Sequence, residues 1–209
     1  MKSKRNAQRP DNRRANIADE AARIMMEQGV TDYRLAKAKA RERLGLGRGP
    51  LPTNEEVEAA LAARNRIFKS DSQPDELRRL REAAIEVMRR LQPFSPRLVG
   101  SVLTGTASEH SAIDLHLYSD TPETVGAELS ALGLGPRAIQ FQHRWRRDSA
   151  EPVPGFRFYE DEIEYLAAVF PEKRRAHAPL SRVDGRPMRR ADRREVARLL
   201  EEQALLSVR

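Results

Sequence analysis

The chain has 209 residues, of which 38 are basic and 31 acidic, so its formal net charge is +7, and it contains no cysteine. The missing cysteines exclude disulfides and thiolate metal sites, and no apolar run approaches the roughly 18 to 20 residues that a membrane-spanning helix needs. We therefore expect a cytoplasmic protein without a membrane partner, and the basic excess favours an anionic partner, although arginine-rich helices also occur on ordinary solvated surfaces.

The N-terminal third of the chain is predicted to be helical. We expect residues 1–15 to be a disordered basic tail and residues 16–70 to be a helical segment, because apolar side chains recur there every three or four positions. Glycines end the first two helices, and capping residues begin the second and third. In chain order these signals are Gly29, Thr31, Gly45, Gly47, and Thr53 or Asn54.

The second of these helices concentrates basic side chains, namely Arg34, Lys37, Lys39, Arg41 and Arg43. Two interpretations of the helical segment stay open. It is a scaffold that packs on the rest of the chain or on a second subunit, or it contacts RNA.

Residues 71–209 have a mixed helical and β character. The segment 76–91 carries an apolar stripe at helical spacing, and after Pro93 short β-type runs alternate with turn residues. The expected elements are strands at 97–103 and 112–117, a helix at 122–132, a hairpin whose arms 138–147 and 156–170 are joined by 148–155, and a C-terminal helix from 186 onward.

The second expected strand carries two polar side chains on one face. Asp114 and His116 are two positions apart, so they point together while the leucines and isoleucine between them point into the core. Upstream of this strand, Gly100 permits a tight turn and a close backbone approach to a ligand, and Ser101 adds a hydroxyl and an amide beside it. The combination suits a phosphate group.

The passage from Leu98 to Asp120 resembles the signature of the nucleotidyltransferase superfamily (DNA polymerase β-like, minimal nucleotidyltransferase fold), in which a Gly-Ser turn precedes a strand with two alternating carboxylates. The resemblance covers roughly Leu77 to Phe170, and the chain looks like a divergent bacterial member. It implies an α+β fold over residues 71–209, with a mixed β-sheet packed with helices. It also implies three carboxylates that hold divalent metals, Mg²⁺ or Mn²⁺, with a nucleoside triphosphate.

The resemblance assigns roles to individual residues. Gly100 and Ser101 match the phosphate-binding turn, and Asp114 matches the first carboxylate and metal ligand. His116 stands where the second carboxylate is expected, and its imidazole suits manganese, zinc or iron better than magnesium.

The third acid is expected from the segment YEDEIEYLAAVF, where alternation places Glu160, Glu162 and Glu164 on one face. We expect Glu164 to be the catalytic, metal-binding acid, because it is the last one before the apolar run. A slip of one residue presents Asp161 instead. The alternative is that these acids solvate the exposed face of a hairpin.

Basic clusters lie next to the expected strands. Residues 143–147 and 172–177 are suited to a triphosphate or an RNA backbone, with Trp145 available for base stacking, or they keep an arginine-rich sheet edge soluble. We expect His110 to face solvent. Arg189 and Arg190 belong to a segment that resembles a tail element of some bacterial members, where they would close over the substrate.

These expectations support more than one function. The first is an enzyme that transfers a nucleoside monophosphate from a nucleoside triphosphate to a hydroxyl of RNA (a tRNA, for example), protein or a small molecule. The second is a catalytically degenerate module of the same fold that binds nucleotide, RNA or a partner protein, and the replacement of the second carboxylate by His116 favours it. The third is a protein-interaction component, such as the neutralising partner of a toxin.

Overall fold

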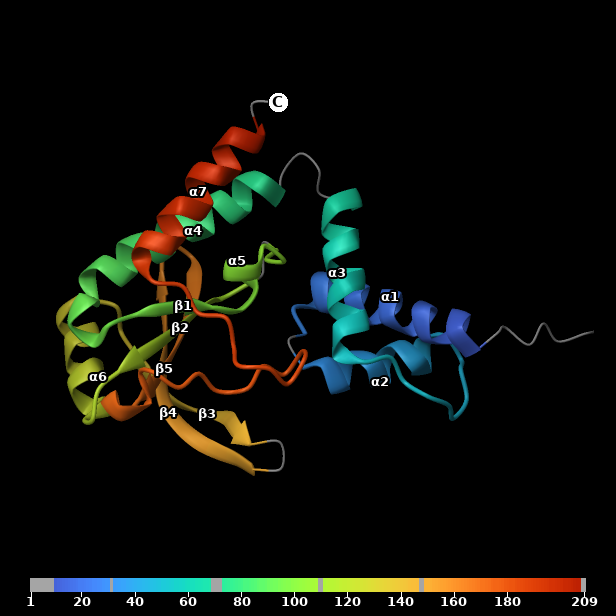
Figure 1. The fold of residues 1–209 in the computed structure, drawn as a ribbon, viewed down its shortest axis with the longest axis horizontal. Coiled ribbons are helices and arrows are strands. Elements are labelled where there is room, and N and C mark those ends of the chain that lie inside the picture. The colour runs from blue at the N-terminus through green and yellow to red at the C-terminus, as the bar shows by residue number, and fades with distance from the viewer. Residues whose placement is uncertain (1–9, 31, 69–72, 109–110, 147–148, 208–209) are drawn as a thin grey trace, which may run out of the picture. The chain divides into compact units, whose positions relative to one another are not determined.

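The computed structural model describes residues 10–30, 32–68, 73–108, 111–146 and 149–207. The chain divides into two compact units, Met1–Phe68 and Lys69–Arg209 (Figure 1). This division lies at Phe68, against the expected residue 70. Part of the expected tail, residues 1–9, lies outside the described residues, whereas residues 10–15 are helical and not part of a disordered tail.

The first unit is built from α1 (Pro10–Gln28), α2 (Tyr33–Arg43) and α3 (Asn54–Phe68). Their buried side chains meet in one small cluster, to which α2 contributes Ala36 and Ala40 and α3 contributes Val57. The buried residues of α2 are alanines, whose small side chains let this helix pack close to α1.

Capping residues set the boundaries of these helices. Thr53 and Glu56 form a reciprocal capping box, in which each side chain accepts a hydrogen bond from the other residue's backbone N–H, at 3.1 and 2.6 Å. The signal at Thr53 is thereby confirmed. Asp32 is the N-cap of α2, and its side chain accepts from the Leu35 backbone N–H at 2.8 Å. The expected cap, Thr31, lies outside the described residues.

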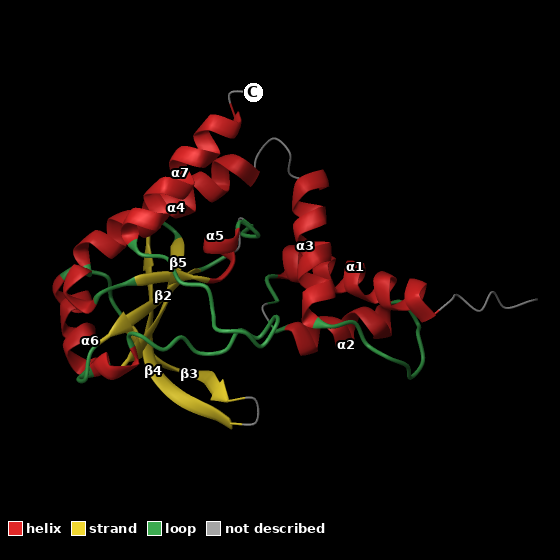
Figure 2. Cartoon of the chain, viewed as in Figure 1, coloured by secondary structure: helices red, strands yellow, loops and turns green. Residues whose placement is uncertain are grey.

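The second unit combines helices with one sheet, an α+β arrangement that confirms the coarse fold class (Figure 2). Its elements are α4 (Gln73–Arg90), η1 (Gln92–Phe94), β1 (Arg97–Val99), α5 (Gly100–Thr104), β2 (Ile113–Tyr118), α6 (Pro122–Ala131), β3 (Arg137–Arg146), β4 (Ser149–Glu160), β5 (Ile163–Phe170), η2 (Glu172–Arg174) and α7 (Arg193–Ser207).

The sheet is mixed and has the strand order β1-β2-β5-β4-β3. β2 is parallel to β5, and the other neighbouring strands are antiparallel. The register places Asp114 opposite Leu166 of β5 and opposite Val99 of β1. The polar positions of β2 therefore lie in the middle of a three-strand segment rather than at an edge.

The two faces of the sheet are covered differently. On one face, Ile113, Leu115 and Leu117 pack in a single core cluster with apolar side chains of α4, α6 and α7. On the other face, a smaller cluster is formed by Tyr118, Val153, Ala168 and Phe170, with Phe141 and Trp145 packed against it. His116 lies on this second face, since it is one residue out of phase with Leu115.

Two strand predictions are wrong in extent. The first strand ends at Val99, and helix α5 begins at Gly100, so residues 100–103 are helical. The segment 156–170 is two strands, because Asp161 and Glu162 both have positive φ values, 46° and 65°, and form a tight turn between β4 and β5. The expected loop 148–155 consequently belongs largely to β4. Before Gly155 that strand pairs with β3 alone, which accommodates Pro152 and Pro154.

The C-terminal helix also begins later than expected. Asp192 caps α7 by accepting a hydrogen bond from the Glu195 N–H at 2.9 Å, and residues 186–191 are not helical. The stretch between β5 and α7, residues 175–192, is called the strap below. Among the described residues, none of the helices combines the length and the apolar character needed to span a membrane.

Candidate functional site

The turn at Gly100 touches the acidic strand. Gly100 has φ +71°, a conformation that favours glycine, and a Cβ atom built there would overlap the Asp114 carboxylate oxygen Oδ2. The structure therefore brings together the Gly-Ser turn and the first expected carboxylate, on the same side of the sheet. The Ser101 hydroxyl makes no hydrogen bond with any described residue, so it is available to a ligand.

Asp114 has an unusual protonation equilibrium. Burial, followed by the negative charge of Glu164, raises the pKa of Asp114 to about 7, although the positive charge of Arg182 acts in the opposite direction. Asp114 and Glu164 thus face the same space from neighbouring strands. A cation or hydrogen-bond donor placed beside Asp114 would favour its ionised form.

His116 occupies an enclosed aromatic position. Its side chain is 2% exposed, its ring lies 4.6 Å from that of Phe170 and 5.3 Å from that of His143, and its Nδ1 has no hydrogen-bond partner. Burial, with the charges of His143 and Arg190, lowers the pKa of His116 well below its usual value. The imidazole is therefore neutral at physiological pH and is packed like an aromatic core residue.

Glu164 lies on the same face as Asp114, but it already has partners. The Arg157 Nε lies 3.0 Å from its Oε1, and the Tyr159 hydroxyl donates to that oxygen at 3.0 Å. The other three acids of the segment lie elsewhere. Glu160 pairs with Arg90, and Asp161, the expected alternative, lies with Glu162 in the turn. The strict alternation expected for Glu160, Glu162 and Glu164 is wrong, because the turn interrupts the strand.

The strap crosses the face that holds these groups. It begins at the β3 edge, where the Leu180 N–H donates to the Arg144 carbonyl at 2.5 Å, and it reaches the opposite edge, where Ala191 exchanges backbone hydrogen bonds with Leu98 of β1. Between these edges Arg190 Nη1 donates to the Tyr118 hydroxyl at 2.6 Å. Figure 1 shows this orange-to-red segment leading into α7.

Two strap arginines direct positive charge toward the site. Arg182 donates to the Gln142 carbonyl at 2.9 Å and lowers the pKa values of both Asp114 and His143, and Arg190 lowers that of His116. Arg190 was expected near the substrate, whereas no sequence pattern singled out Arg182. The sequence could not have indicated Arg182, because this residue lies beside β3 only through the path that the strap takes in the folded unit.

The basic cluster around Trp145 makes contacts within itself that occupy part of the indole. Arg174 lies over the Trp145 ring at 4.3 Å from its centroid, and the indole Nε1 donates to the His177 carbonyl at 3.5 Å. One face of the indole is thereby occupied. His110, expected in solvent, lies outside the described residues.

The residues do not fit the two-metal, three-carboxylate centre that the resemblance implies. His116 is enclosed among rings, and Glu164 is held by Arg157 and Tyr159. In the described part of the chain, His, Asp and Glu side chains form no group of three or more that could hold a metal ion.

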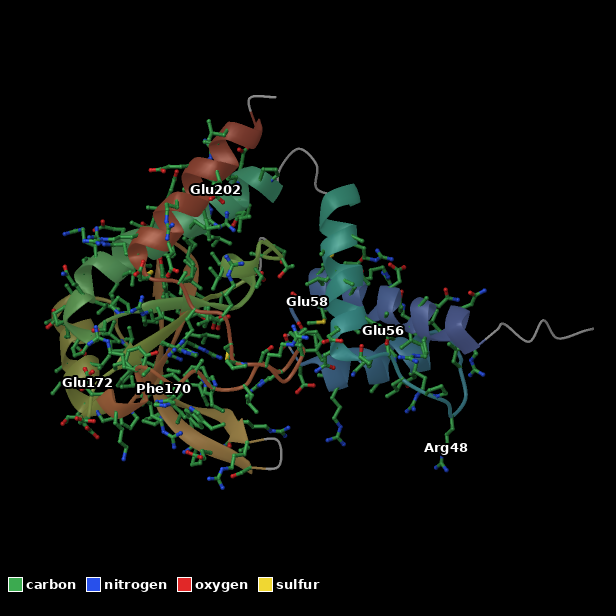
Figure 3. The ribbon with its side chains drawn as sticks, viewed as in Figure 1. Arg48, Glu56, Glu58, Phe170, Glu172 and Glu202 are labelled. Atoms are coloured by element: carbon green, nitrogen blue, oxygen red, sulfur yellow. The ribbon has the colours of Figure 1, made fainter. Side chains whose placement is uncertain are left out.

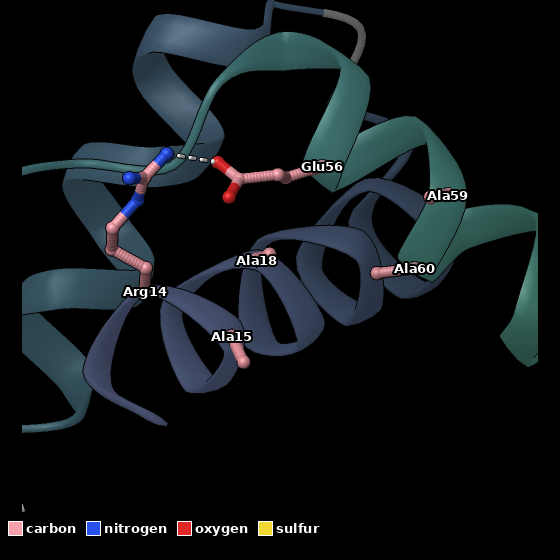
Figure 4. Close-up of a pocket in the computed structure, with 6 residues that line it drawn as sticks. All are labelled: Arg14, Ala15, Ala18, Glu56, Ala59 and Ala60. Carbon is pink, nitrogen blue, oxygen red and sulfur yellow. Dashed lines mark hydrogen bonds and ion pairs between the residues drawn. The ribbon is translucent and has the colours of Figure 1, made fainter. Parts of the chain in front are cut away.

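Hollows lie on the surface of both units, and the two described below are not lined by Gly100, Ser101 or Asp114. One, of about 470 Å³, lies between α1 and α3, where four alanines line it beside the Arg14–Glu56 ion pair of 2.8 Å (Figure 4). The other, of about 230 Å³, involves Arg189 and Arg190 and lies at the start of α7. No protein-family model matches this chain, and no curated protein matches it.

Proposed function

We infer that residues 69–209 form a nucleotidyltransferase-like module that binds the phosphates of a nucleoside triphosphate at the Gly100–Ser101 turn without carrying out metal-dependent transfer. The observation that carries this proposal is the contact of Gly100 with the Asp114 carboxylate. At one point the chain has a positive φ, a glycine whose side-chain position is filled by the Asp114 carboxylate, and a serine hydroxyl that no described residue hydrogen-bonds. Such a point admits a phosphate close to the backbone.

Positive charge near this point also supports phosphate binding. Arg182 acts on Asp114, and Arg190 acts on His116 from the other end of the strap. A guanidinium group donates in a planar fork that matches two phosphate oxygens. The strap arginines are thus suited to neutralise a triphosphate held over the face of β2.

The surroundings of His116 and Glu164 favour binding over transfer. Transfer by two divalent ions requires a set of oxygen ligands that clamps both the attacking and the leaving oxygen. His116, the next residue on the same face of β2 as Asp114, is a neutral, buried imidazole, and Glu164 is bound by Arg157. The module therefore lacks the second oxygen ligand of β2.

One observation favours transfer as a second candidate function. The charge of Glu164 raises the pKa of Asp114, so two carboxylates on neighbouring strands repel each other. A cation between them would relieve this repulsion. In that case the chain would transfer a nucleoside monophosphate from the triphosphate to a hydroxyl acceptor.

Calorimetry tests the binding proposal. We expect the full chain to bind at least one of ATP, CTP, GTP and UTP, in the presence of Mg²⁺ or Mn²⁺, with a Kd below about 1 mM. Ser101→Ala should weaken this binding about tenfold, since it removes one hydroxyl donor. Ser130→Ala on the exposed surface of α6 is the matched control and should bind as the unmodified chain does. No heat of binding with any of the four nucleotides would refute the proposal.

A single substitution separates binding from transfer. His116→Asp supplies an oxygen ligand two positions after Asp114, so pyrophosphate release by this variant with magnesium would show that the missing ligand alone prevents transfer. The unmodified chain should release none. Pyrophosphate release by the unmodified chain would instead establish the second candidate.

A further inference from the structure

We propose that α2 and the loop after it, residues 32–51, form a surface that binds single-stranded RNA. This inference concerns the first unit and is independent of the nucleotide site. Its starting point is the distribution of charge along the chain. Residues 1–68 contain 15 basic and 9 acidic side chains, whereas residues 69–209 contain 23 and 22, so nearly all of the net positive charge belongs to the first unit.

Within the described part of that unit, the excess is confined to one segment. Residues 10–31 and 52–68 each carry a net charge of −1, and residues 32–51 carry a net charge of +4. Helices α1 and α3 are therefore slightly acidic, and α2 with its following loop is strongly basic. A localised excess of this kind indicates an anionic partner for that segment rather than a generally solvated unit.

The basic side chains of the segment divide into two classes. Lys37 donates to the Pro52 carbonyl and to Asn54 Oδ1, at 3.1 and 2.7 Å, Lys39 donates to Gln28 Oε1 at 3.3 Å, and Arg43 pairs with Glu20 at 3.5 Å. These three cations serve the unit's own structure. They lie against α1 and the start of α3.

The other three, Arg34, Arg41 and Arg48, have no side-chain hydrogen bond or ion pair with any described residue. Arg34 and Arg41 are seven positions apart on α2 and so share one face, and Figure 3 shows Arg48 extending away from the helices. Each keeps a complete guanidinium fork for an external acceptor. Phosphate oxygens match that fork in two-point hydrogen bonding.

Apolar side chains interleave with these arginines. Leu35, Leu44 and Leu51 are 48%, 39% and 36% exposed, and each lies within three positions of one of the three arginines. A duplex hides its base faces and presents mainly phosphates, whereas a single strand presents unstacked bases as well. Guanidinium planes and apolar side chains contact such bases, so the combination favours single-stranded RNA over duplex DNA.

Fluorescence anisotropy of the full chain with a labelled 20-nucleotide oligouridine tests the proposal. Each neutralised phosphate of a single strand contributes a slope of about 0.7 in log affinity against log salt. Three arginine contacts therefore predict an approximately 20-fold loss of affinity between 50 and 200 mM KCl. The double variant R34Q/R41Q should bind at least about tenfold more weakly at 50 mM and show a salt slope smaller by about 1.4.

The control is R79Q/R89Q, which removes the same two charges from α4, where these arginines pair with Glu76 and Glu86. It should bind as the unmodified chain does. An equal loss in the control would overturn the proposal, because net charge alone would then explain binding. Tighter binding to a 20-base-pair DNA duplex, or binding to phosphatidylserine vesicles without binding to oligouridine, would overturn it too.

A second variant keeps the test possible if R34Q/R41Q does not fold. Arg48 lies in a loop, so R48Q should fold as the unmodified chain does, and we expect its affinity for oligouridine to fall about threefold.

Discussion

The two faces of β2 differ in what covers them. The side chains of Ile113, Leu115 and Leu117 are fully buried beneath helices, in the larger core cluster. The opposite face carries Asp114 and His116, and the strap crosses it with arginines. The first face stabilises the fold through burial alone, whereas the second holds ionisable groups away from their usual protonation. In β2, therefore, the residues that stabilise the unit and the residues suited to bind a ligand lie on opposite faces of one strand.

The largest expected effect comes from the apolar face. Leu115→Ala should lower the free energy of unfolding by about 3 kcal/mol, because it removes a fully buried side chain and leaves a cavity. Urea unfolding followed by the fluorescence of Trp145, the chain's one tryptophan, measures this. Leu205→Ala is the control, since Leu205 is 72% exposed and should cost little.

The next effect has the opposite sign. The pKa of Asp114 is raised to about 7 in the folded state, against an ordinary value of 3.8, so stability falls as the pH rises through this window. Asp114→Asn should therefore stabilise the unit by about 2 kcal/mol at pH 8 in metal-free buffer, roughly half of the full effect, because Asp114 is only partly buried and solvent screens its charge. The gain should vanish below about pH 3, where Asp114 is protonated in both the folded and the unfolded state of the unmodified chain. A gain of equal size at both pH values would show that charge is not its cause.

His143 should produce a smaller dependence on the acid side. Burial lowers its pKa to about 4, against an ordinary value of 6.5, so its contribution is complete above pH 6.5 and is lost as the pH falls toward 4. His143→Phe keeps the contacts with Phe141 and Phe170. As the pH falls from 7 to 4.5, the free energy of unfolding of the unmodified chain should decrease by about 1.5 kcal/mol more than that of the variant. Unfolding experiments at the two pH values measure this difference. A constant difference between the two proteins would contradict this.

The smallest expected effect on stability is that of Glu164. Its ion pair with the half-exposed Arg157 should contribute less than about 1 kcal/mol, since solvent screens it. Glu164→Gln should nevertheless lower the pKa of Asp114, because it removes the nearby negative charge. A carboxyl titration by NMR measures this. Arg157→Gln breaks the same ion pair but keeps the charge, so it should leave the pKa of Asp114 high.

Local signals predicted the parts of the fold that depend on near neighbours. The capping box of Thr53 and Glu56 is visible as a spacing of three, and the requirement for glycine at position 100 follows from a turn before an acidic strand. The expectation that Glu160, Glu162 and Glu164 share one face of a strand was wrong because the local signal for a turn is missing. The turn at Asp161 and Glu162 contains neither glycine nor asparagine, the usual residues with positive φ, so its sequence looks like a continuous strand.

The amino-acid sequence by itself determined the helical first unit, the α+β character of the second, and the alternation that puts Asp114 and His116 on one face of β2. These features depend on periodicity and on contacts between near neighbours in the chain. Only the tertiary structure decided that His116 is enclosed by rings, that Glu164 is held by Arg157, and that the strap returns Arg182 to the site. Such contacts join residues far apart in sequence, and their geometry depends on the register and packing of the whole sheet.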